Sequence, residues 1–471
     1  MLELSLSIRS GVPLVEQIVG AVRCQIDDAI LRPGCRLPPI RQLAARHGIS
    51  RFTVVEAYER LVAQGYLSSR RGSGFYVSHR DSLLRPAHQP LPEIEQAVNE
   101  ASLMRRAMGV GAQGLQVSAG WLPRSWFDQA EISRQMRAML RNEHLNLTDY
   151  NRPEGYEPLR QYLVRRLEEL EIATQASQIL LTQGATQALD FSARHYVRPD
   201  EAVFVDDPGY PTLFGNLRLH GARLIGIPWT SEGPDPVELE RLAALHKPRV
   251  YFTQSVLHNP TGACLTPANA YRILLCAERY DFHIVEDDTY SDFHAEKATR
   301  LASLDRLNRV VYISSFSKTL SGNLRVGYVT ARPDILTALT NIKVLSTLST
   351  SAASEELVYR MLTEGYYRKH IERLRTRLGE ETAKTLRMSE RLGLESFVVP
   401  RGGLFLFLRL SGGEDAVSLA TQAAGEDLNL APGRLFRPQN QASPYLRLNV
   451  VYGHDSRFEG FLEKALAGKA L

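Results

Sequence analysis

One lysine, Lys318, stands among short hydroxylic residues in the stretch SFSKTLSGNLRVGY, and Arg325 follows it seven positions later. Such a lysine could be a solvated surface residue, a contact to a phosphate group, or a nucleophilic amine that holds a cofactor. Hydroxyls and an arginine bind phosphate well, and a lysine amine that loses its proton readily forms Schiff bases with carbonyl compounds. The stretch therefore suggests an anion contact, through Ser315, Ser317 and Arg325, beside a reactive amine.

Other polar groups stand where apolar runs of the sequence end. Asp287 and Tyr290 come at and after HIVED, Asn259 follows RVYFT, and a glycine-led helix start follows QILLT. The start of that helix would offer backbone N–H groups to a phosphate, and its residues are Gly184, Ala185 and Thr186. A phosphate site, a carboxylate for a pyridine nitrogen, donors to a phenolate oxygen and an amine are together what pyridoxal 5′-phosphate requires.

These groups need a scaffold that brings strand ends together. Seven apolar, β-rich runs alternate with helical stretches, at 178–182, 202–206, 223–227, 249–253, 283–287, 310–314 and 325–329. Such a pattern predicts an α/β domain with a mostly parallel, seven-stranded sheet covered on both faces. Ligands of these folds bind at the carboxyl ends of the strands, where the polar groups stand.

The first eighty residues have a different pattern. Apolar residues recur every four positions on one helix face, at Leu14, Ile18, Val22, Ile26 and Ile30. A short helix after Pro39 would end at Gly48, and a third helix capped by Ser50 would end at Gly65. Two strands around Gly72 and Gly74 would then form a β-hairpin. This order predicts an α+β winged helix-turn-helix.

A winged helix-turn-helix can place the third helix in the major groove of double-stranded DNA. There Arg51 and Thr53, next to the cap Ser50, would reach base edges or phosphates. Phosphate or minor-groove contacts suit the remaining candidates Arg41, Arg70 and Arg71, with Gly72 in the wing turn. The alternative is a three-helix interaction module with solvated arginines. The combination of two helices, a tight turn and a basic glycine wing favours DNA binding.

Composition agrees with this division. Residues 1–80 hold 11 arginines, no lysine and 6 acidic residues, which gives them a net charge of +5. The whole chain has a net charge of +4, so residues 81–471 carry −1 and are near neutral. A hydrophobic content of 44% predicts a globular protein, and without an apolar run of bilayer length no membrane partner is expected. The N-terminus has no basic region followed by an apolar core, so we expect no secretory signal and a cytoplasmic protein. The four cysteines form no CxxC pair, which predicts reduced thiols and no metal site.

The 471 residues therefore divide into a DNA-binding domain at 1–78, a linker at 79–115 with a possible helical patch at 92–108, and a large domain at 116–471. A small α+β subdomain is expected at about 350–471.

Residues 11–78 resemble the winged helix of GntR-type bacterial regulators, on the stretches PLVEQI, LRPGCRLPPIRQLAARHGISRFTVVEAYERLVAQGYL and RRGSGFYV. Two residues depart from that pattern, Pro39 and Phe52, and Phe52 could contact a thymine methyl. Residues 116–471 resemble the class I aminotransferases of fold type I. The combination resembles the MocR family of bacterial transcriptional regulators.

The aminotransferase resemblance implies a role for each candidate. Lys318 would form the internal aldimine with pyridoxal 5′-phosphate, and Asp287 would pair with the pyridine nitrogen. The other implied roles are phenolate contacts for Asn259 and Tyr290, phosphate contacts for Ser315, Ser317, Arg325 and the amides of 184–186, ring stacking for Tyr210, a phosphate contact in the neighbouring subunit for Tyr150, and effector carboxylate binding for Arg447.

The MocR resemblance also implies a head-to-tail homodimer, paired DNA half-sites at a promoter, and a small amine or amino-acid effector. The first hypothesis is thus a regulator that senses an amino compound through Lys318, without physiological turnover. The second is a regulator that responds to the supply of cofactor alone. The third is a working aminotransferase that carries a DNA-binding domain. The small departure of the N-terminal domain from its pattern favours regulation.

Overall fold

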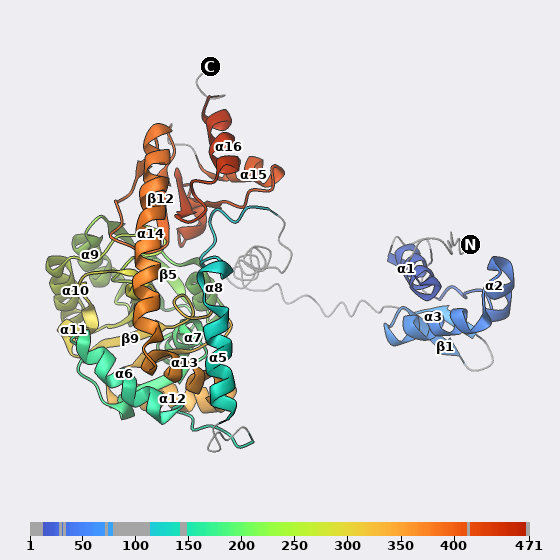
Figure 1. Cartoon of the computed structure of the whole chain (residues 1–471), viewed down its shortest axis with the longest axis horizontal. Helices are drawn as coiled ribbons and strands as arrows, with labels where there is room; N and C mark the ends of the chain where they lie inside the picture. Colours follow the sequence, from blue (N-terminus) through green and yellow to red (C-terminus); the bar gives the residue numbers. More distant parts are fainter. Residues whose placement is uncertain are drawn as a thin grey trace. The chain divides into compact units, whose positions relative to one another are not determined.

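The computed structural model describes residues 13–27, 31, 34–70, 74–78, 114–141, 148–411 and 415–467. The chain divides into two compact units, Met1–Pro90 and Leu91–Leu471, which Figure 1 colours along the sequence. The possible helical patch at 92–108 lies outside the described residues.

Three helices and a two-stranded antiparallel sheet form the N-terminal unit. They are α1 (Leu14–Asp27), α2 (Ile40–His47), α3 (Arg51–Ala63), β1 (Leu67–Arg70) and β2 (Gly74–Val77). The N–H of Thr53 donates to the hydroxyl of Ser50 at 3.2 Å and caps α3. Gly48 ends α2 with a φ of +63°, a conformation that glycine adopts without strain. These two caps define the tight turn of the helix-turn-helix.

A core of its own holds this unit together. Ile18 and Val22 of α1 pack with Val54 and Leu61 of α3, and all four are buried. Buried Tyr58 donates its hydroxyl to the carbonyl of Pro38 at 3.0 Å, which ties α3 to the segment before α2. The apolar side of each helix therefore faces inward, and the start of α3 stays accessible.

An eight-stranded sheet lies at the centre of the C-terminal unit, in the order β3-β10-β9-β8-β7-β4-β5-β6. Its strands are β3 (Ile179–Thr182), β4 (Ala202–Asp207), β5 (Arg223–Thr230), β6 (Gly233–Pro234), β7 (Val250–Thr253), β8 (His283–Asp287), β9 (Val310–Ser315) and β10 (Gly327–Thr330). Strands β9, β8, β7, β4 and β5 pair in parallel, whereas β10 pairs antiparallel with both β3 and β9. The mostly parallel sheet is confirmed, but it has one strand more than predicted, because the two residues of β6 are too few to form an apolar run.

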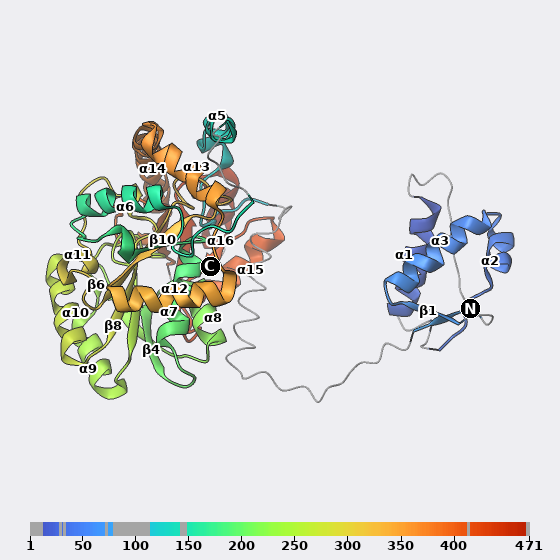
Figure 2. The same ribbon diagram turned by 90° about the horizontal axis from the view of Figure 1, so that it is seen from below.

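Helices cover both faces of this sheet (Figure 2). One face packs on α7 (Ala185–Tyr196), α8 (Pro211–Leu219) and α12 (Pro333–Thr347). The other packs on α6 (Glu157–Glu169), α9 (Pro236–His246), α10 (Pro267–Arg279), α11 (Leu301–Asp305), α13 (Ala352–Thr363) and α14 (Tyr366–Arg391). Successive side chains of β4 alternate between these cores, since Val203 and Val205 belong to the first and Phe204 to the second.

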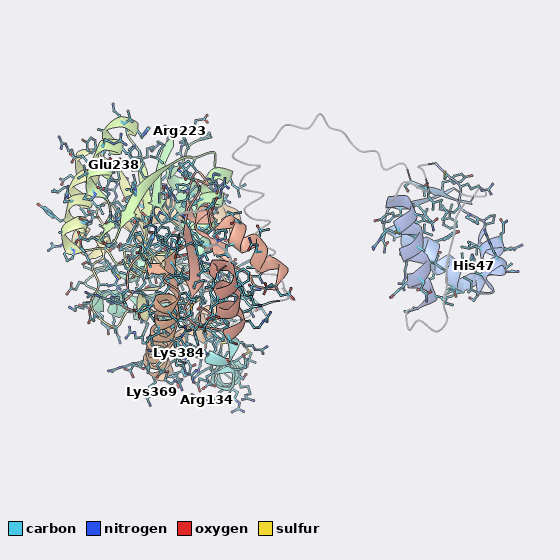
Figure 3. All side chains as sticks on the ribbon, turned by 90° about the horizontal axis from the view of Figure 1, so that it is seen from above. His47, Arg134, Arg223, Glu238, Lys369 and Lys384 are labelled. Carbon is cyan, nitrogen blue, oxygen red and sulfur yellow. The ribbon has the colours of Figure 1, made fainter. Side chains whose placement is uncertain are left out.

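A second sheet follows late in the chain, with four antiparallel strands in the order β11-β12-β14-β13. These are β11 (Glu395–Ser396), β12 (Phe405–Arg409), β13 (Ala431–Pro432) and β14 (Tyr445–Asn449). The helices α5 (Gln129–Leu140), α15 (Val417–Gly425) and α16 (Ser456–Ala467) and the short 3-10 helices η1 (Arg124–Trp126), η2 (Ala176–Gln178), η3 (Ser291–Phe293) and η4 (Gly433–Phe436) complete the unit. Exposed Lys369 and Lys384 of α14 are labelled in Figure 3.

The topology brings several chain segments to one edge of the large sheet. Strands β3, β4, β7, β8 and β9 end at that edge, and the antiparallel β10 begins there. Residues 316–326, which join β9 to β10, therefore stay at this edge. Within the described residues, no helix combines the length and the apolar character that crossing a membrane requires.

Candidate functional site

A pocket opens at the shared edge of the sheet. It is lined by Ala185, Thr186, Leu189, Tyr210, Gln254, Asn259, Asp287, Thr289, Tyr290, Ser315, Ser317, Lys318 and Arg325. Most of the predicted site residues thus lie together, although they come from the ends of five strands and the start of β10.

Lys318 supplies the amine of this pocket. Its Nζ donates to the carbonyl oxygen of Gly120 at 2.7 Å and lies 5.9 Å from the centroid of the Tyr290 ring. Burial, together with the positive charges of Arg447 and Arg325, lowers the pKa of Lys318 to about 8. A far larger fraction of the amine is therefore neutral near pH 7 than for an exposed lysine, and a neutral amine is a nucleophile.

Asp287 supplies a carboxylate whose position is set by three donors. The N–H and hydroxyl of Thr289 donate to Oδ1 at 3.1 and 2.5 Å, and the amide of Gln254 donates to Oδ2 at 2.8 Å. Burial raises the pKa of Asp287. A cationic partner such as a protonated pyridine would offset this desolvation and favour the charged carboxylate.

Donors for an anion gather where α7 begins and β10 starts. Arg325 donates from Nη1 to the hydroxyl of Ser317 at 3.0 Å, and the hydroxyls of Ser315 and Ser317 lie 3.0 Å apart. Gly184 caps α7 with a φ of +76°, and a Cβ there would lie 2.7 Å from Nη2 of Arg325. Glycine thus lets the guanidinium approach the helix start, where the first N–H groups have no partner within the helix.

Arg447 of β14 is a partly buried cation beside the pocket, where it bonds the pocket residue Asn259. Its guanidinium lies over Phe405 and Phe436, at 4.4 and 4.8 Å from the ring centroids. Nη1 donates to Oδ1 of Asn259 at 2.8 Å and Nη2 to the carbonyl of Ser118 at 2.6 Å, while Nε is buried without a partner among the described residues. Burial lowers the pKa of Arg447 to about 10. A partly buried guanidinium bonded to neutral oxygens is well suited to an anionic ligand.

Two tyrosines complete the walls of the pocket. Tyr210 follows β4 and precedes α8, and burial raises the pKa of its hydroxyl. Tyr290 follows β8, packs edge-on against Phe405 at 5.4 Å, and has its pKa raised by burial as well. Both phenols therefore stay protonated and can donate hydrogen bonds at neutral pH.

Tyr150 does not join the pocket. Its side chain is 85% exposed, and it does not line the cavity of its own chain. This position is compatible with a contact to another subunit, which one chain by itself cannot make.

The pocket fits pyridoxal 5′-phosphate in the order of its polar groups. Hydroxyls, a guanidinium and a helix start lie at one end for a phosphate. A buried carboxylate and a partly buried amine both line the same cavity, as a pyridine nitrogen and an aldehyde would require. Within the described part of the chain, no cluster of side chains could hold a metal ion.

The second candidate site is the start of α3. Ser50 and Arg51 are exposed there, Thr53 is half-buried, and Arg41 on α2 is exposed. Phe52 is 74% exposed, although it is a large apolar residue in a unit with a well-packed core. The predicted wing residues Arg71 and Gly72 lie outside the described residues, as does the side chain of Arg70.

Several site residues were missed by sequence reasoning. Gln254 and Thr289 orient Asp287, but a glutamine and a threonine near a strand end carry no chemical signature of their own. The carbonyls of Ser118 and Gly120 contact Arg447 and Lys318, and no side-chain pattern predicts a backbone acceptor. The position of Gln254 directly after the run RVYFT was the one available signal.

Comparisons with known proteins match both units. The family described as "Aminotransferase class I and II" matches residues 124–463, and the family described as "Bacterial regulatory proteins, gntR family" matches residues 14–77.

Relatives and solved structures agree with these matches. The HTH-type transcriptional regulator YdcR of Escherichia coli is 28% identical, over 94% of this chain and 96% of its own. The "Probable rhizopine catabolism regulatory protein MocR" of Rhizobium meliloti is 26% identical, over 90% of this chain and 87% of its own. The crystal structure of LysN, an alpha-aminoadipate aminotransferase from Thermus thermophilus complexed with N-(5'-phosphopyridoxyl)-L-leucine, is 26% identical with a TM-score of 0.72, over 79% of this chain and 98% of LysN.

Proposed function

Because this chain belongs to the aminotransferase class I and II family and carries a gntR-family DNA-binding domain, as MocR-type regulators do, we propose that it senses an amino compound. It would do so with pyridoxal 5′-phosphate bound at Lys318, and it would change its affinity for promoter DNA in response. The observation that supports this most is the pocket in which Lys318, Asp287 and Arg325 lie together. When bound, this cofactor supplies an aldehyde that condenses with amines and a pyridine ring that accepts electrons.

The residues of the chain would divide the work of binding. Arg325, Ser315 and Ser317 would hold the phosphate, and Asp287 would keep the pyridine nitrogen protonated. Asn259 and Tyr290 would donate to the phenolate oxygen. The carboxylate of an amino-acid effector would bind Arg447, whose hydrogen-bond partners among the described residues are the neutral oxygens of Asn259 and Ser118.

We further propose that the protein acts as a homodimer, with the two chains arranged head to tail. Exposed Tyr150 would reach the phosphate site of the neighbouring chain. A dimer would also present two winged helices, which suits paired half-sites on DNA.

A second candidate function is a working aminotransferase that carries a DNA-binding domain. The similarity to LysN, an aminotransferase, favours it, and the amine, carboxylate and guanidinium of the pocket would suit turnover as well as sensing.

A two-part screen separates these functions. Amines and amino acids are added to the full-length protein with pyridoxal 5′-phosphate, and both the visible spectrum and the affinity for the protein's own upstream DNA are recorded. A regulator should show one compound that changes both readings. Rapid turnover with a 2-oxo acid and no effect on DNA would assign the enzyme instead. A response of DNA affinity to the cofactor, but to no amine, would assign a sensor of cofactor supply.

Phe52 leads to a prediction about base recognition. Phe52 lies on the side of α3 opposite the buried residues, so it can contact a thymine methyl in the major groove. Burying one methyl group contributes about 0.8 kcal/mol, so replacing that thymine with deoxyuridine should weaken binding about fourfold. Phe52→Ala should abolish this difference, and Phe52→Leu should retain part of it.

The measurement uses duplexes selected from a random library by the full-length protein. Each thymine is replaced by deoxyuridine in turn, and affinities are compared at one salt concentration. If Phe52→Ala kept the wild-type sensitivity at every thymine, the contact would not exist.

A further inference from the structure

Residues 114–121, here called the strap, form an irregular segment with a turn at residues 117 and 118, and this segment contacts residues of the candidate site. Leu115 forms a parallel bridge with Leu428, and its N–H donates to the carbonyl of Asp427 at 2.8 Å. Gly114 permits this approach at a φ of +103°, because a Cβ there would lie 2.1 Å from the carbonyl oxygen of Asp427. The N–H of Asn449 donates to Val117 at 2.7 Å. The strap is thus attached to the part of the chain that carries β13 and β14.

Four consecutive strap carbonyls accept hydrogen bonds from side chains. Arg447 donates to Ser118 at 2.6 Å, Lys318 to Gly120 at 2.7 Å, and the amide of Asn449 to Ala119 and Trp121 at 2.7 and 2.9 Å. Two of the three donors, Lys318 and Arg447, are the groups proposed to bind cofactor and effector. The third, Asn449, is fully buried and does not line the pocket.

Lys318 cannot serve the strap and a carbonyl ligand at once. When its neutral amine condenses with an aldehyde, a carbon–nitrogen double bond forms, and both hydrogens of the amine leave in the released water molecule. The nitrogen then has no hydrogen to donate to Gly120 unless it is protonated. If it is protonated, the direction of its single N–H is fixed by the new double bond. Binding of an aldehyde therefore removes one strap contact.

Arg447 likewise cannot keep both of its present hydrogen bonds while it binds a carboxylate. Bidentate binding of a carboxylate uses two N–H groups of one guanidinium, whereas Nη1 now serves Asn259 and Nη2 serves Ser118. The amine of an incoming amino acid would also replace Lys318 on the former aldehyde carbon. Its carbon–nitrogen double bond forms as the one to Lys318 breaks, and its two amine hydrogens pass to the lysine nitrogen. Lys318 could then donate to Gly120 again, while Ser118 loses Arg447.

We infer that the strap is the element that couples the pocket to the DNA-binding unit, an inference that rests on the proposed function. Residues 79–113 join the winged helix to residue 114, so the strap is covalently connected to the DNA-binding unit through this part of the chain. The strap can be attached, with these hydrogen bonds made, or detached, with them broken. A ligand that competes for Lys318 or Arg447 binds the detached state more tightly, and the difference between its affinities for the two states shifts the equilibrium toward the detached state. Cofactor and effector act on different strap contacts, so each produces its own state.

Hydrogen exchange of the full-length protein tests this directly, with pyridoxal 5′-phosphate as the probe. A hydrogen bond from a charged donor contributes enough free energy for about a tenfold change in an opening equilibrium. Amides of the 114–121 peptide should therefore exchange about tenfold faster once the cofactor is bound, and visible absorption reports binding in the same sample. Visible absorption with unchanged amide exchange would refute the coupling role of the strap and leave the proposed function standing. If neither the absorption nor the faster exchange appeared, the proposed function would be refuted, and the role of the strap with it.

Asn449→Leu provides the functional test, because it removes two strap contacts and leaves Lys318 and Arg447 in place. The variant should keep the cofactor spectrum, exchange rapidly at 114–121 with or without cofactor, and lose the response of DNA affinity to cofactor. Gln116→Leu is the matched control, since it also replaces an amide side chain with leucine within the strap, but the Gln116 amide nitrogen bonds no group among the described residues. This variant keeps every strap carbonyl and should respond like the wild type. A variant with a detached strap and a wild-type DNA response would overturn the inference.

Discussion

Replacing Lys318 with alanine should abolish covalent attachment of pyridoxal 5′-phosphate altogether. Among the described residues, Lys318 is the one lysine that lines the pocket, and burial lowers its pKa to about 8. Its amine is therefore available for condensation with an aldehyde near neutral pH. The wild-type protein should absorb visible light, and borohydride should fix one cofactor per chain on the peptide that contains residue 318. Lys318→Ala should show neither the absorption band nor the labelled peptide. Noncovalent binding through the phosphate contacts should persist at higher cofactor concentration.

Lys297→Ala is a suitable control, because Lys297 is exposed and pairs with Glu171 away from the pocket. It should keep the spectrum of the wild type. An unchanged spectrum in Lys318→Ala would mean that another amine holds the cofactor, and the assignment of the pocket would then be wrong.

Arg51→Ala should cause the largest loss of DNA affinity among single substitutions in the N-terminal unit. Arg51 is the first residue of α3 and is exposed beside the cap Ser50, where a recognition helix enters the major groove. Loss of a base contact costs about 1–3 kcal/mol, roughly a 5- to 150-fold change in Kd. Titrations over several salt concentrations distinguish two cases. Loss of a base contact relaxes the sequence specificity at that base. Loss of a phosphate contact weakens binding to all DNA sequences and lowers the slope of log affinity against log salt concentration by about one.

Arg60→Ala is the matched control for that measurement. Arg60 is on the same helix and pairs with Glu56 at 2.7 Å, so its removal also changes the charge by one but leaves the start of α3 intact. Equal affinities for Arg51→Ala and wild type across the salt series would exclude Arg51 from the interface.

Strand positions were the most predictable part of the fold. All seven predicted runs became strands of the large sheet, because continuous apolar stretches between helices are a strong local signal. The two-residue β6 has no such signal, since its pairing with β5 depends on the turn that precedes it. The four-stranded sheet was anticipated only as a small α+β subdomain, because β11 and β13 have two residues each.

The resemblance to MocR-type regulators is confirmed by the two family matches and by relatives that carry both units. The candidate site was predictable where a side chain has a distinctive chemistry, as for Lys318, Asp287 and Arg325. Contacts among protein groups were not predictable. Asn259, expected to face a phenolate oxygen, accepts a hydrogen bond from Arg447 through its Oδ1, and such a pairing depends on how two distant strands meet.

The strap has a consequence for how variation in this protein should be interpreted. Its acceptors at residues 118–121 are main-chain oxygens, and every amino acid carries one. A saturation-mutagenesis map would therefore record tolerance along much of the strap and intolerance at distant Asn449, as if the two were unrelated. Apart from Gly114 and Ser118, whose own chemistry holds the strap, homologous regulators could exchange strap residues during evolution and still keep these four hydrogen bonds. Sequence covariation between the two segments would be weak, although their physical connection is direct.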